Sequence, residues 1–323
     1  PVLADGVHTV ICRYVDAACN AGESTSVDVI VDTTAPTGGP TIEVPGSGPG
    51  GENNAENPEV VVTPPAGETG GHTDCKISGS GYNGAFVDFT TVTSPWTLPT
   101  LPEGTYTITC HYVDEAGTIG PDTSYELVID RTAPGAPTVS GPTGPTSDNT
   151  PELTVTGAEP GGTIKCSIDG ADPVVVSSPF TTPELADGTH IIICTQTDAA
   201  GNTSAGGQTT VVVDTTPPGS VAISGPSSAT SDTTPSFNLS GAGAGDNYEC
   251  KTDGGAFTTT GAVYTTATLA DGTHTVTCHL VDQAGNAGPD TSANVTIDTA
   301  APGSVTITGR SAASACSYFR RAS

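Results

Sequence analysis

Apolar and polar residues alternate along the segment 269–286, which reads LADGTHTVTCHLVDQAGN. One alternate set is largely apolar and consists of His274, Val276, Cys278 and Leu280. The intervening set is polar and consists of Thr275, Thr277 and His279. Successive side chains of a β-strand point to opposite faces of its sheet. The pattern therefore predicts a strand with one face toward a core, and it places the cysteine on that inward face.

Almost the same phrase occurs at 3–20, 101–118 and 185–202, with the cysteine in the same place. A second marker, Asp followed three residues later by Ala-Pro or Pro-Pro, begins at Asp32, Asp130, Asp214 and Asp298, at intervals of 98, 84 and 84 residues. Repeats of this length are small domains with cores of their own. The predicted divisions are 1–32, 33–130, 131–214, 215–298 and 299–323, of which the first and last are incomplete. The unit 33–130 carries 14 extra residues.

Short alternating segments separated by turn residues fill the rest of each unit, without helical periodicity. Asp-Gly pairs follow the segments TIKCSI and NYECKT and indicate hairpin turns. An aromatic residue precedes the leucine of each complete phrase by five positions, as Trp96, Phe180 or Tyr264, and is predicted to lie in the core. The predicted fold is all-β, with tandem antiparallel β-sandwiches arranged as a rod.

The cysteines of the three whole units recur at fixed spacing. Cys166 and Cys250 each lie 28 residues before the cysteine of the phrase, and Cys75 lies 35 before it because part of the extra sequence intervenes. We therefore predict the pairs Cys75–Cys110, Cys166–Cys194 and Cys250–Cys278. An even number of cysteines at a constant spacing indicates a disulfide framework and an oxidising, extracellular compartment.

The combination of SDNTP, KCSIDG, LADGTH, DAAGN and VDTTPP resembles the tandem immunoglobulin-like repeats of large bacterial surface proteins and adhesins. By this resemblance, 1–32 supplies the C-terminal strands of an incomplete Ig-like domain, and 33–130, 131–214 and 215–298 are whole Ig-like domains. Residues 299–323 are then the start of a further domain or an atypical basic tail. The resemblance implies an extracellular stalk, often stiffened by calcium between domains. The cysteine pair is not universal in that family, and here we expect it to link strand C to strand F, unlike the B–F bridge of antibody domains.

Three cysteines lack a predicted partner: Cys12, Cys19 and Cys316. Cys12 corresponds to Cys110, but no partner strand precedes it in this sequence. The chain begins inside a unit without an initiator Met, which predicts that the natural N-terminus lies upstream. A chain cut from a longer protein is favoured over a subunit that is completed by the tail of a neighbouring copy.

The formal net charge of −27 argues against partners that need a basic surface, such as nucleic acid and anionic membranes. No apolar run approaches the roughly 18 residues that a membrane helix requires. The charge suits a soluble, self-repelling rod, a cation-binding surface or a salty habitat. The expected partners are further repeats of the same chain or copies of it, together with an unidentified surface ligand.

Catalysis is not predicted, because nearly every reactive residue recurs from unit to unit whereas a catalytic site is singular. A zinc site at His274 and Cys278 is excluded, since four strand residues separate these side chains by about 13 Å. His8, Tyr106, His190 and His274 occupy one position after an acidic turn and resemble the tyrosine corner of immunoglobulin domains. Isopeptide cross-links are rejected because Lys76, Lys165 and Lys251 have outward parity.

Carboxylates gather near the predicted joints, where they would repel one another unless a cation such as Ca²⁺ lay among them. One group of four is Asp148, Asp187, Asp214 and Asp282. The joint before it offers Glu56, Glu103, Asp130 and Asp198, the first joint Asp5, Asp32 and Asp114, and the last joint Asp232, Asp271 and Asp298. The alternative is that these acids are turn-forming residues only. Calcium is a candidate ligand that the family resemblance favours.

Asn-X-Ser/Thr sequences occur at Asn202, Asn238 and Asn294, so glycosylation at these residues is a further hypothesis, with chance occurrence as its alternative. The sequence as a whole predicts a structural segment of an extracellular filament or adhesin stalk at the cell surface. The alternative is a glycan-binding or host-binding adhesin module, for which the extended loops of 33–130 are the candidate region.

Overall fold

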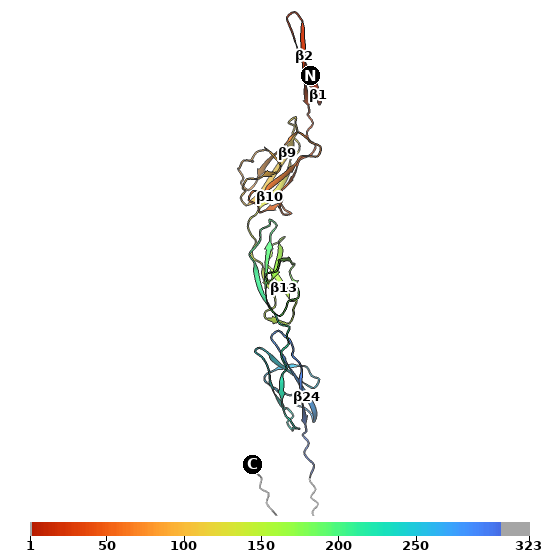
Figure 1. Ribbon diagram of the computed structural model, residues 1–323, viewed down its shortest axis with the longest axis vertical. Coiled ribbons are helices and arrows are strands. Elements are labelled where there is room, and N and C mark those ends of the chain that lie inside the picture. Colours follow the sequence, from red (N-terminus) through yellow and green to blue (C-terminus); the bar gives the residue numbers. More distant parts are fainter. Residues whose placement is uncertain (1, 305–323) are drawn as a thin grey trace, which may run out of the picture. The chain divides into compact units, whose positions relative to one another are not determined.

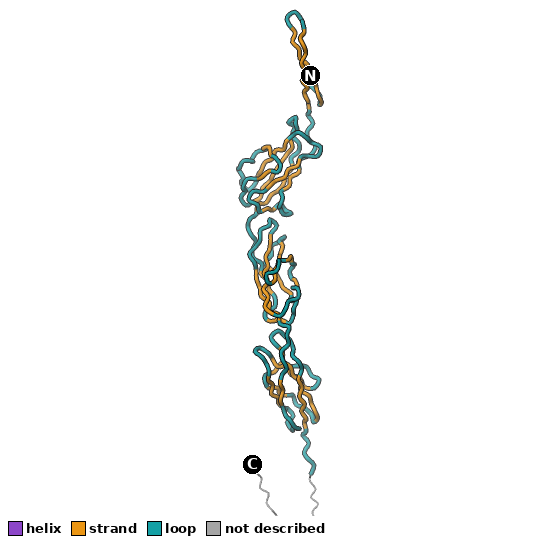
Figure 2. The backbone as a smooth tube through the Cα atoms, viewed as in Figure 1, coloured by secondary structure: helices purple, strands orange, loops and turns teal. Residues whose placement is uncertain are grey.

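The computed structural model describes residues 2–304, and these residues form strands and turns without a helix (Figure 1; Figure 2). The predicted all-β fold class is therefore confirmed. Accordingly, no helix in this part of the chain has the length and hydrophobicity needed to cross a membrane. The chain separates into two compact units: 1–143 with 150–185 and 189–211, and 144–149 with 186–188 and 212–323.

An antiparallel hairpin of β1 (Gly6–Val15) and β2 (Ala21–Val31) forms the first element. Cys12 lies opposite Thr25 in its register. A two-stranded sheet cannot bury its apolar side chains by itself. Ile11 and Tyr14 are accordingly 65% and 78% exposed.

Residues 41–129 form two facing sheets around one core. The three-stranded sheet has the order β3 (Thr41–Glu43), β5 (Glu59–Thr63), β8 (Trp96–Thr97). The five-stranded sheet has the order β4 (Glu52–Asn53), β10 (Thr123–Ile129), β9 (Gly104–Val113), β6 (His72–Ser78), β7 (Thr90–Val92). Trp96, Leu101 and Ile108 are among the side chains buried in this core.

The next sheets repeat this topology. One has the order β11 (Thr138–Ser140), β13 (Glu152–Thr156), β16 (Phe180–Thr181). The other has the order β12 (Pro145–Thr146), β18 (Gly207–Val213), β17 (Gly188–Thr197), β14 (Thr163–Ile168), β15 (Val174–Val175). The hairpin turn after β14 uses left-handed backbone at Asp169 (φ 52°) and Gly170 (φ 78°), as its Asp-Gly sequence predicts.

The last pair of sheets lies in residues 222–297. One has the order β19 (Ala222–Ser224), β20 (Ser236–Ser240), β23 (Val263–Thr265). The other has the order β22 (Thr258–Thr260), β21 (Asn247–Thr252), β24 (Gly272–Val281), β25 (Thr291–Ile297). An isolated parallel bridge between Thr230 and Ile297 takes the place that β4 and β12 occupy in the preceding sheets.

In the three sandwiches, the strands that carry the repeated phrase point their cysteines into the cores, whereas Cys12 on β1 is exposed. Val276, Cys278 and Leu280 of β24 are fully buried. The intervening polar side chains differ from the expectation of a solvent-facing set, because Thr277 and His279 are also buried. The ring of Phe257 lies over His279, with the ring centroids 4.0 Å apart, and shields that face from water.

Candidate functional site at the turns that end each sandwich

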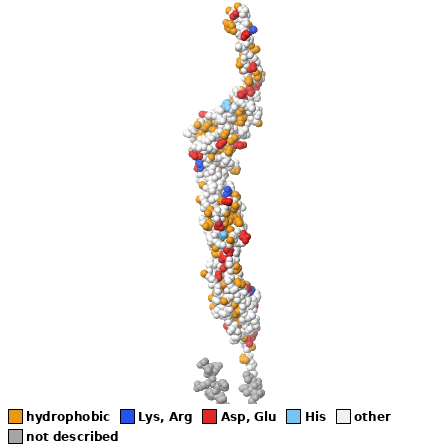
Figure 3. All heavy atoms as spheres, viewed as in Figure 1, with side chains coloured by type: hydrophobic (Ala, Val, Ile, Leu, Met, Phe, Trp, Pro, Cys, Tyr) orange, Lys and Arg blue, Asp and Glu red, His pale blue; other side chains and the backbone are white. Residues whose placement is uncertain are grey.

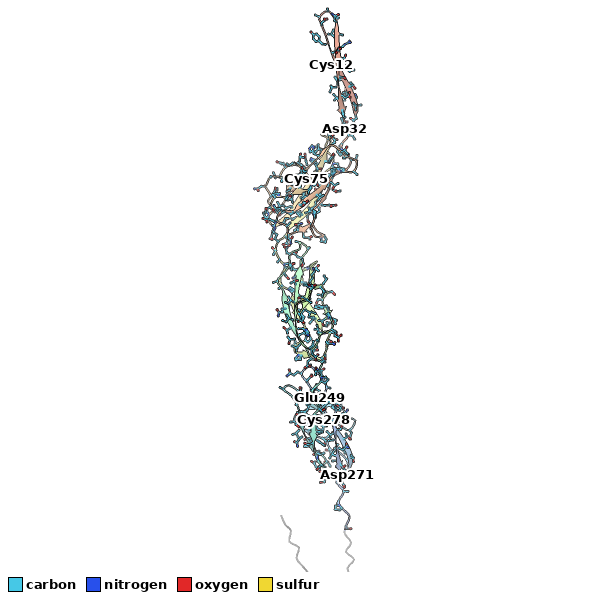
Figure 4. All side chains as sticks on the ribbon, viewed as in Figure 1. Cys12, Asp32, Cys75, Glu249, Asp271 and Cys278 are labelled. Carbon is cyan, nitrogen blue, oxygen red and sulfur yellow. A yellow bond between two sulfur atoms is a disulfide. The ribbon has the colours of Figure 1, made fainter. Side chains whose placement is uncertain are left out.

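Three disulfides tie neighbouring strands of one sheet together. They join Cys75 to Cys110, Cys166 to Cys194 and Cys250 to Cys278. In each case the two cysteines lie directly opposite one another in the strand register. Figure 4 labels Cys75 and Cys278 within their sandwiches. The bridges therefore staple adjacent strands within a sheet and do not join the two sheets, as the bridge of an antibody domain does.

The Asp-Thr-Thr marker at the end of a repeat binds the acidic turn 28 residues before it. Asp187 accepts hydrogen bonds from the backbone N–H of Thr215 (2.9 Å), from the Thr215 hydroxyl (2.7 Å) and from the Thr216 hydroxyl (2.7 Å). The hydrogen bond from the Thr216 hydroxyl, followed in size of effect by the one from the Thr215 hydroxyl, lowers the pKa of Asp187. Equivalent contacts join Thr33 and Thr34 to Asp5, Thr132 to Glu103, and Thr299 to Asp271.

The aspartate of each marker closes a tight turn of its own. Asp32, Asp130, Asp214 and Asp298 each accept a hydrogen bond from the backbone N–H two residues later, at 3.0, 2.9, 3.1 and 3.0 Å. Asp232 does the same for Thr234 at 2.9 Å. These carboxylates fix the direction in which the chain leaves or enters a sandwich.

An aspartate after each phrase strand organises the turn that follows. Asp282 accepts hydrogen bonds from the backbone N–H groups of Ala284 (2.9 Å) and Asn286 (2.8 Å) and from the Asn286 side-chain amide (2.9 Å). Although burial raises the pKa of Asp282, the hydrogen bonds from Asn286 and Ala284 outweigh it and lower the pKa. Asp198 and Asp16 hold Asn202 and Asn20 in the same way.

The asparagine of this turn also binds the end of the preceding repeat. The side-chain nitrogen of Asn286 donates a 2.6 Å hydrogen bond to the backbone carbonyl of Asp214. Asn202 donates the equivalent bond, of 2.9 Å, to the carbonyl of Asp130. One amide group therefore satisfies both the turn aspartate of its own repeat and the last carbonyl of the repeat before it. We call this arrangement the amide joint.

Backbone contacts support each amide joint. At the joint of Asn286, the backbone N–H of Ser147 donates to the carbonyl of Ala284 at 3.2 Å. At the joint of Asn202, a β-carbon at Gly48 would collide with the carbonyl oxygen of Ala199. Only glycine fits this close approach of two turns.

The turn that follows Asp114 lacks the asparagine. Thr118 stands in its place and gives Asp114 only a backbone hydrogen bond, of 2.8 Å. Within residues 2–304, no hydrogen bond joins Thr118 to Asp32. The amide joint therefore occurs before and after residues 131–214 but not at the entry to residues 33–130.

The arrangement of these acids does not form a metal cage in the described residues. There, no group of three or more His, Cys, Asp or Glu side chains is placed to hold a metal ion. The candidate ligands Asp187, Asp214 and Asp282 each bind nearby N–H or hydroxyl groups instead. Glu56 contributes its backbone carbonyl, which accepts a bond from the Arg131 guanidinium at 3.3 Å.

An imidazole or phenol ties the start of three phrase strands to the turn before it. The hydroxyl of Tyr106 donates to the carbonyl of Pro102 at 2.9 Å, and His274 Nε2 lies 2.9 Å from the carbonyl oxygen of Ala270. His8 makes the same contact with Ala4 at 2.6 Å. His274 Nδ1 additionally lies 2.9 Å from Asp253 in the hairpin turn, and His190 Nδ1 lies 2.7 Å from Asp169.

The sequence analysis did not predict a second set of contacts, in which a lysine and a histidine pack against a phenylalanine ring. Lys251 lies over the Phe257 ring at 4.1 Å, and His279 packs beneath that ring and lies 2.8 Å from Asp290. Lys76, Phe89, His111 and Asp122 repeat the arrangement. The signal was available in the sequence: Phe and His occur together in these two repeats, and Pro173 and Thr195 replace them together in the third.

Residues 222–299 match the family of bacterial Ig-like domains. This match confirms, over these residues, the resemblance to bacterial Ig-like repeats that the sequence suggested. No curated protein matches the chain. Similar solved structures include the FN1–FN3 domains of chicken CNTN1, with 9% identity, a TM-score of 0.35 and coverage of 82% of this chain and 100% of that one. The fibronectin(III)-like modules of Clostridium thermocellum CbhA have 15% identity, a TM-score of 0.36 and coverage of 54% and 94%.

The remaining candidate residues are the cysteines without a predicted partner and the asparagines of the Asn-X-Ser/Thr sequences. Cys12 and Cys19 are exposed free thiols, and Figure 4 labels Cys12 on the hairpin, whereas Cys316 falls outside the described residues. The side-chain nitrogen of Asn202, to which a glycan would attach, is engaged in the amide joint. Asn294 accepts a hydrogen bond from the Thr275 hydroxyl at 3.0 Å, and Asn238 is exposed.

Proposed function

We propose that the chain is a structural segment of an extracellular filament or adhesin stalk, in which disulfide-bonded Ig-like domains act as spacers. The observation that carries this proposal is the amide joint, in which Asn202 and Asn286 bind the carbonyls of Asp130 and Asp214. A repeated bond between consecutive repeats supports a role in which the orientation of one domain constrains the next. Extracellular localisation is supported by the disulfides, and the expected partners are further repeats or copies of the chain.

The surface chemistry agrees with an exposed, hydrated spacer. Asp and Glu number 35 against eight Lys and Arg, and acidic side chains recur over the visible surface in Figure 3. Such a surface repels its own copies and resists unspecific association.

Two substitutions test the joints directly. Asn202→Ala combined with Asn286→Ala removes both amide bonds, each worth about 1 kcal/mol. Small-angle scattering should then show a broader distribution of maximum dimensions, while circular dichroism stays that of the folded chain. Asn238→Ala, on an exposed strand position, is the matched control. Scattering that is identical for the double variant and the control would argue against joints that set orientation.

A ligand-binding adhesin module is the second candidate. A cavity of about 570 Å³ lies beside the extended loop of 33–130 and is lined by Glu68, His72 and Tyr112, among others. Its lining combines polar and apolar side chains, which suits a glycan. Immunogold labelling of native surface fibres with antibodies to 215–298 separates the two functions. Labels along the fibre support the stalk, and labels confined to the fibre tip support the adhesin module.

Calcium at the joints is a finer proposal that rests on the charge and the family resemblance. Its binding would require Asp187 and Asp214 to exchange their threonine hydrogen bonds for a cation. Isothermal titration of the apo chain with CaCl₂, followed by scattering with and without EDTA, tests it. Heat of binding together with a stiffer chain would support calcium. If no heat of binding is measured, these acids act as hydrogen-bond acceptors only.

A further inference from the structure

Two linkers between whole domains, 130–137 and 214–221, begin in the same way. The hydroxyl of Thr132 or Thr216 binds the acidic turn of the domain that ends there. An amide joint then binds the carbonyl of the marker aspartate. Beyond these shared contacts the linkers differ, and the difference determines how firmly each one holds the domains on its two sides.

Arg131 adds a further hold on the 130–137 linker. Its Nη1 donates to the carbonyl of Leu101 at 3.0 Å, and its Nη2 donates to the carbonyls of Ala55 and Glu56 at 2.9 and 3.3 Å. One guanidinium therefore ties the linker to two turns at the end of the preceding sandwich. All three acceptors are uncharged carbonyls, so the hold depends on the fixed directions of the guanidinium N–H groups, which a lysine cannot reproduce.

Gln196 holds the other end of this linker from inside the next sandwich. The residue is only 1% exposed, and its Nε2 donates to the carbonyl of Gly135 at 2.6 Å. Its Oε1 accepts a 2.9 Å hydrogen bond from the backbone N–H of Glu159, which fixes the orientation of the amide. Gly135 is therefore bound to a buried side chain of β17.

The second of these linkers has neither hold. Thr215 stands in the place of Arg131, and Leu280 stands in the place of Gln196. Neither side chain can repeat the contact, because threonine is too short to reach two turns and leucine has no polar group. In the described part of the chain, no hydrogen bond reaches Gly219, which corresponds to the bonded glycine of the other linker.

The contacts leave little of the 130–137 linker unheld. Thr132 is bound to the preceding sandwich and Gly135 to the following one, so only Ala133 and Pro134 lie between them. Pro134 is buried, its ring fixes its own φ, and it restricts the backbone of Ala133. The backbone therefore has little freedom to change the orientation of the two sandwiches.

The 214–221 linker keeps a longer unheld stretch. Thr216 is bound to the preceding sandwich, and the following sandwich next fixes Val221, which is buried in its core. Residues 217–220 lie between them; two are prolines, but Gly219 lacks a β-carbon and can adopt many backbone conformations. The orientation at this linker therefore rests on its amide joint and the backbone contact beside it.

We propose that Arg131 and Gln196 lock the 130–137 linker, so that the sandwiches on its two sides move as one rigid pair, whereas the 214–221 linker is a hinge. The lock needs both side chains, because each of them holds only one end of the linker. The inference rests on the proposed spacer function, since it states where that spacer bends.

Residual dipolar couplings of the backbone amides in the full chain test the proposal. Domains that move as one body share one alignment tensor, and a domain on a hinge has a tensor of its own. In the unchanged chain, one tensor should fit 33–130 and 131–214 together. The domain 215–298 should require a second tensor of different magnitude.

The variant Arg131→Thr with Gln196→Leu installs the two residues that the hinge linker uses. It should lose the common tensor, so that 33–130 and 131–214 need separate fits. Arg131→Lys should weaken the common fit as well, because the charge alone does not reproduce the three hydrogen bonds. Lys165→Thr is the matched control, since it removes one positive charge from β14 away from the linkers, and it should keep the common tensor.

A converse variant keeps the proposal falsifiable if the double substitution disturbs folding. Thr215→Arg leaves the 130–137 linker intact and should bring the tensor of 215–298 closer to that of 131–214. The proposal is overturned if the folded double variant keeps the common tensor, or if one tensor fits all three domains of the unchanged chain. The second of these results would leave the spacer function standing. Three unrelated tensors in the unchanged chain would overturn the lock and count against the spacer function as well.

Discussion

His274 bridges two turns through both of its ring nitrogens: Nδ1 lies 2.9 Å from a carboxylate oxygen of Asp253, and Nε2 lies 2.9 Å from the carbonyl oxygen of Ala270. Both oxygens can only accept hydrogen bonds, so both nitrogens carry protons in the fully bonded state. The imidazolium is therefore the form that this site selects. The bond to Asp253, followed by the bond to Ala270, raises the pKa of His274 above 6.5.

This pair should make the stability of the domain 215–298 depend on pH. Because the folded pKa of His274 is raised, its contribution is fully present below pH 6.5 and is lost as pH rises through the folded pKa. The hydrogen bond from His274 lowers the pKa of Asp253, so that contribution is present above pH 3.8 and is lost as pH falls through the folded pKa. NMR titration of the His274 ring should show its pKa fall in Asp253→Asn. An unchanged pKa would contradict the assigned pair.

The disulfide of 33–130 can be tested with the only tryptophan of the chain, Trp96. Cys75→Ala with Cys110→Ala should lower the free energy of unfolding by about 3 kcal/mol, because the open chain gains conformational entropy. Urea unfolding followed by Trp96 fluorescence measures it. The matched control is Cys250→Ala with Cys278→Ala, which should leave the Trp96 transition in place. Equal shifts in both variants would show that the domains do not unfold independently.

Thiol labelling should divide the cysteines into two groups. Cys12 and Cys19 are exposed and free, so iodoacetamide should modify both in the native, unreduced chain. The six bridged cysteines should react only after reduction under denaturing conditions, because their side chains are buried. Peptide mass spectrometry reads each site. Protection of Cys12 that disappears on reduction alone would indicate a disulfide partner on another polypeptide.

The missing asparagine at the first joint offers a gain-of-function test. Thr118→Asn supplies the side-chain amide that Asn202 and Asn286 use, with Asp32 as the expected acceptor. The ¹⁵N relaxation of residues 6–31 should then report motion more closely coupled to that of the following domain. Thr118→Ser is the control, since it keeps a hydroxyl and adds no amide. Relaxation that is equal in both variants would mean that one amide bond is too weak to order this joint.

The aromatic stack on the outer sheet face should contribute measurable stability. Phe257→Ala removes the ring that both Lys251 and His279 contact and exposes His279, so we expect a loss of about 1–2 kcal/mol. Phe257→Tyr preserves the ring and serves as the control. Thermal unfolding of the Phe257→Ala and Phe257→Tyr variants measures this difference in stability. Equal unfolding midpoints would show that the stack is only a surface contact.

Most of the fold could be predicted from the alternation of apolar and polar strand residues and from the cysteine spacing. Cys278 and Leu280 point inward because the alternation of the strand leaves no other apolar face, and their register follows from the same alternation. His279 could not be predicted as buried, because the ring that covers it comes from the irregular segment after the hairpin turn. Phe180 and Tyr264 were expected in the core, yet both are half-buried, whereas Trp96 is buried and packs against Phe86 of the inserted loop.

The acids show why a site is harder to predict than a fold. The sequence placed Asp187 and Asp214 near one joint, but Asp-Thr-Thr can either ligate a cation or accept hydrogen bonds from its own threonines. The amide joint was missed for a different reason: Asn202 and Asn286 read as ordinary turn residues, and their second acceptor lies 72 residues away in the chain.

The position of the disulfides also sets how far each domain can be drawn out under tension. In 131–214 and 215–298 the bridge encloses 28 residues of sequence between neighbouring strands. Pulling on the two ends of such a domain can unravel the strands outside the bridge, but the enclosed loop cannot lengthen. At about 3.3 Å per extended residue, each bridge withholds about 90 Å of chain. A tether built from these domains would extend under load only until the disulfides carry the force. Reducing agents would cleave the disulfides and increase the maximum extension.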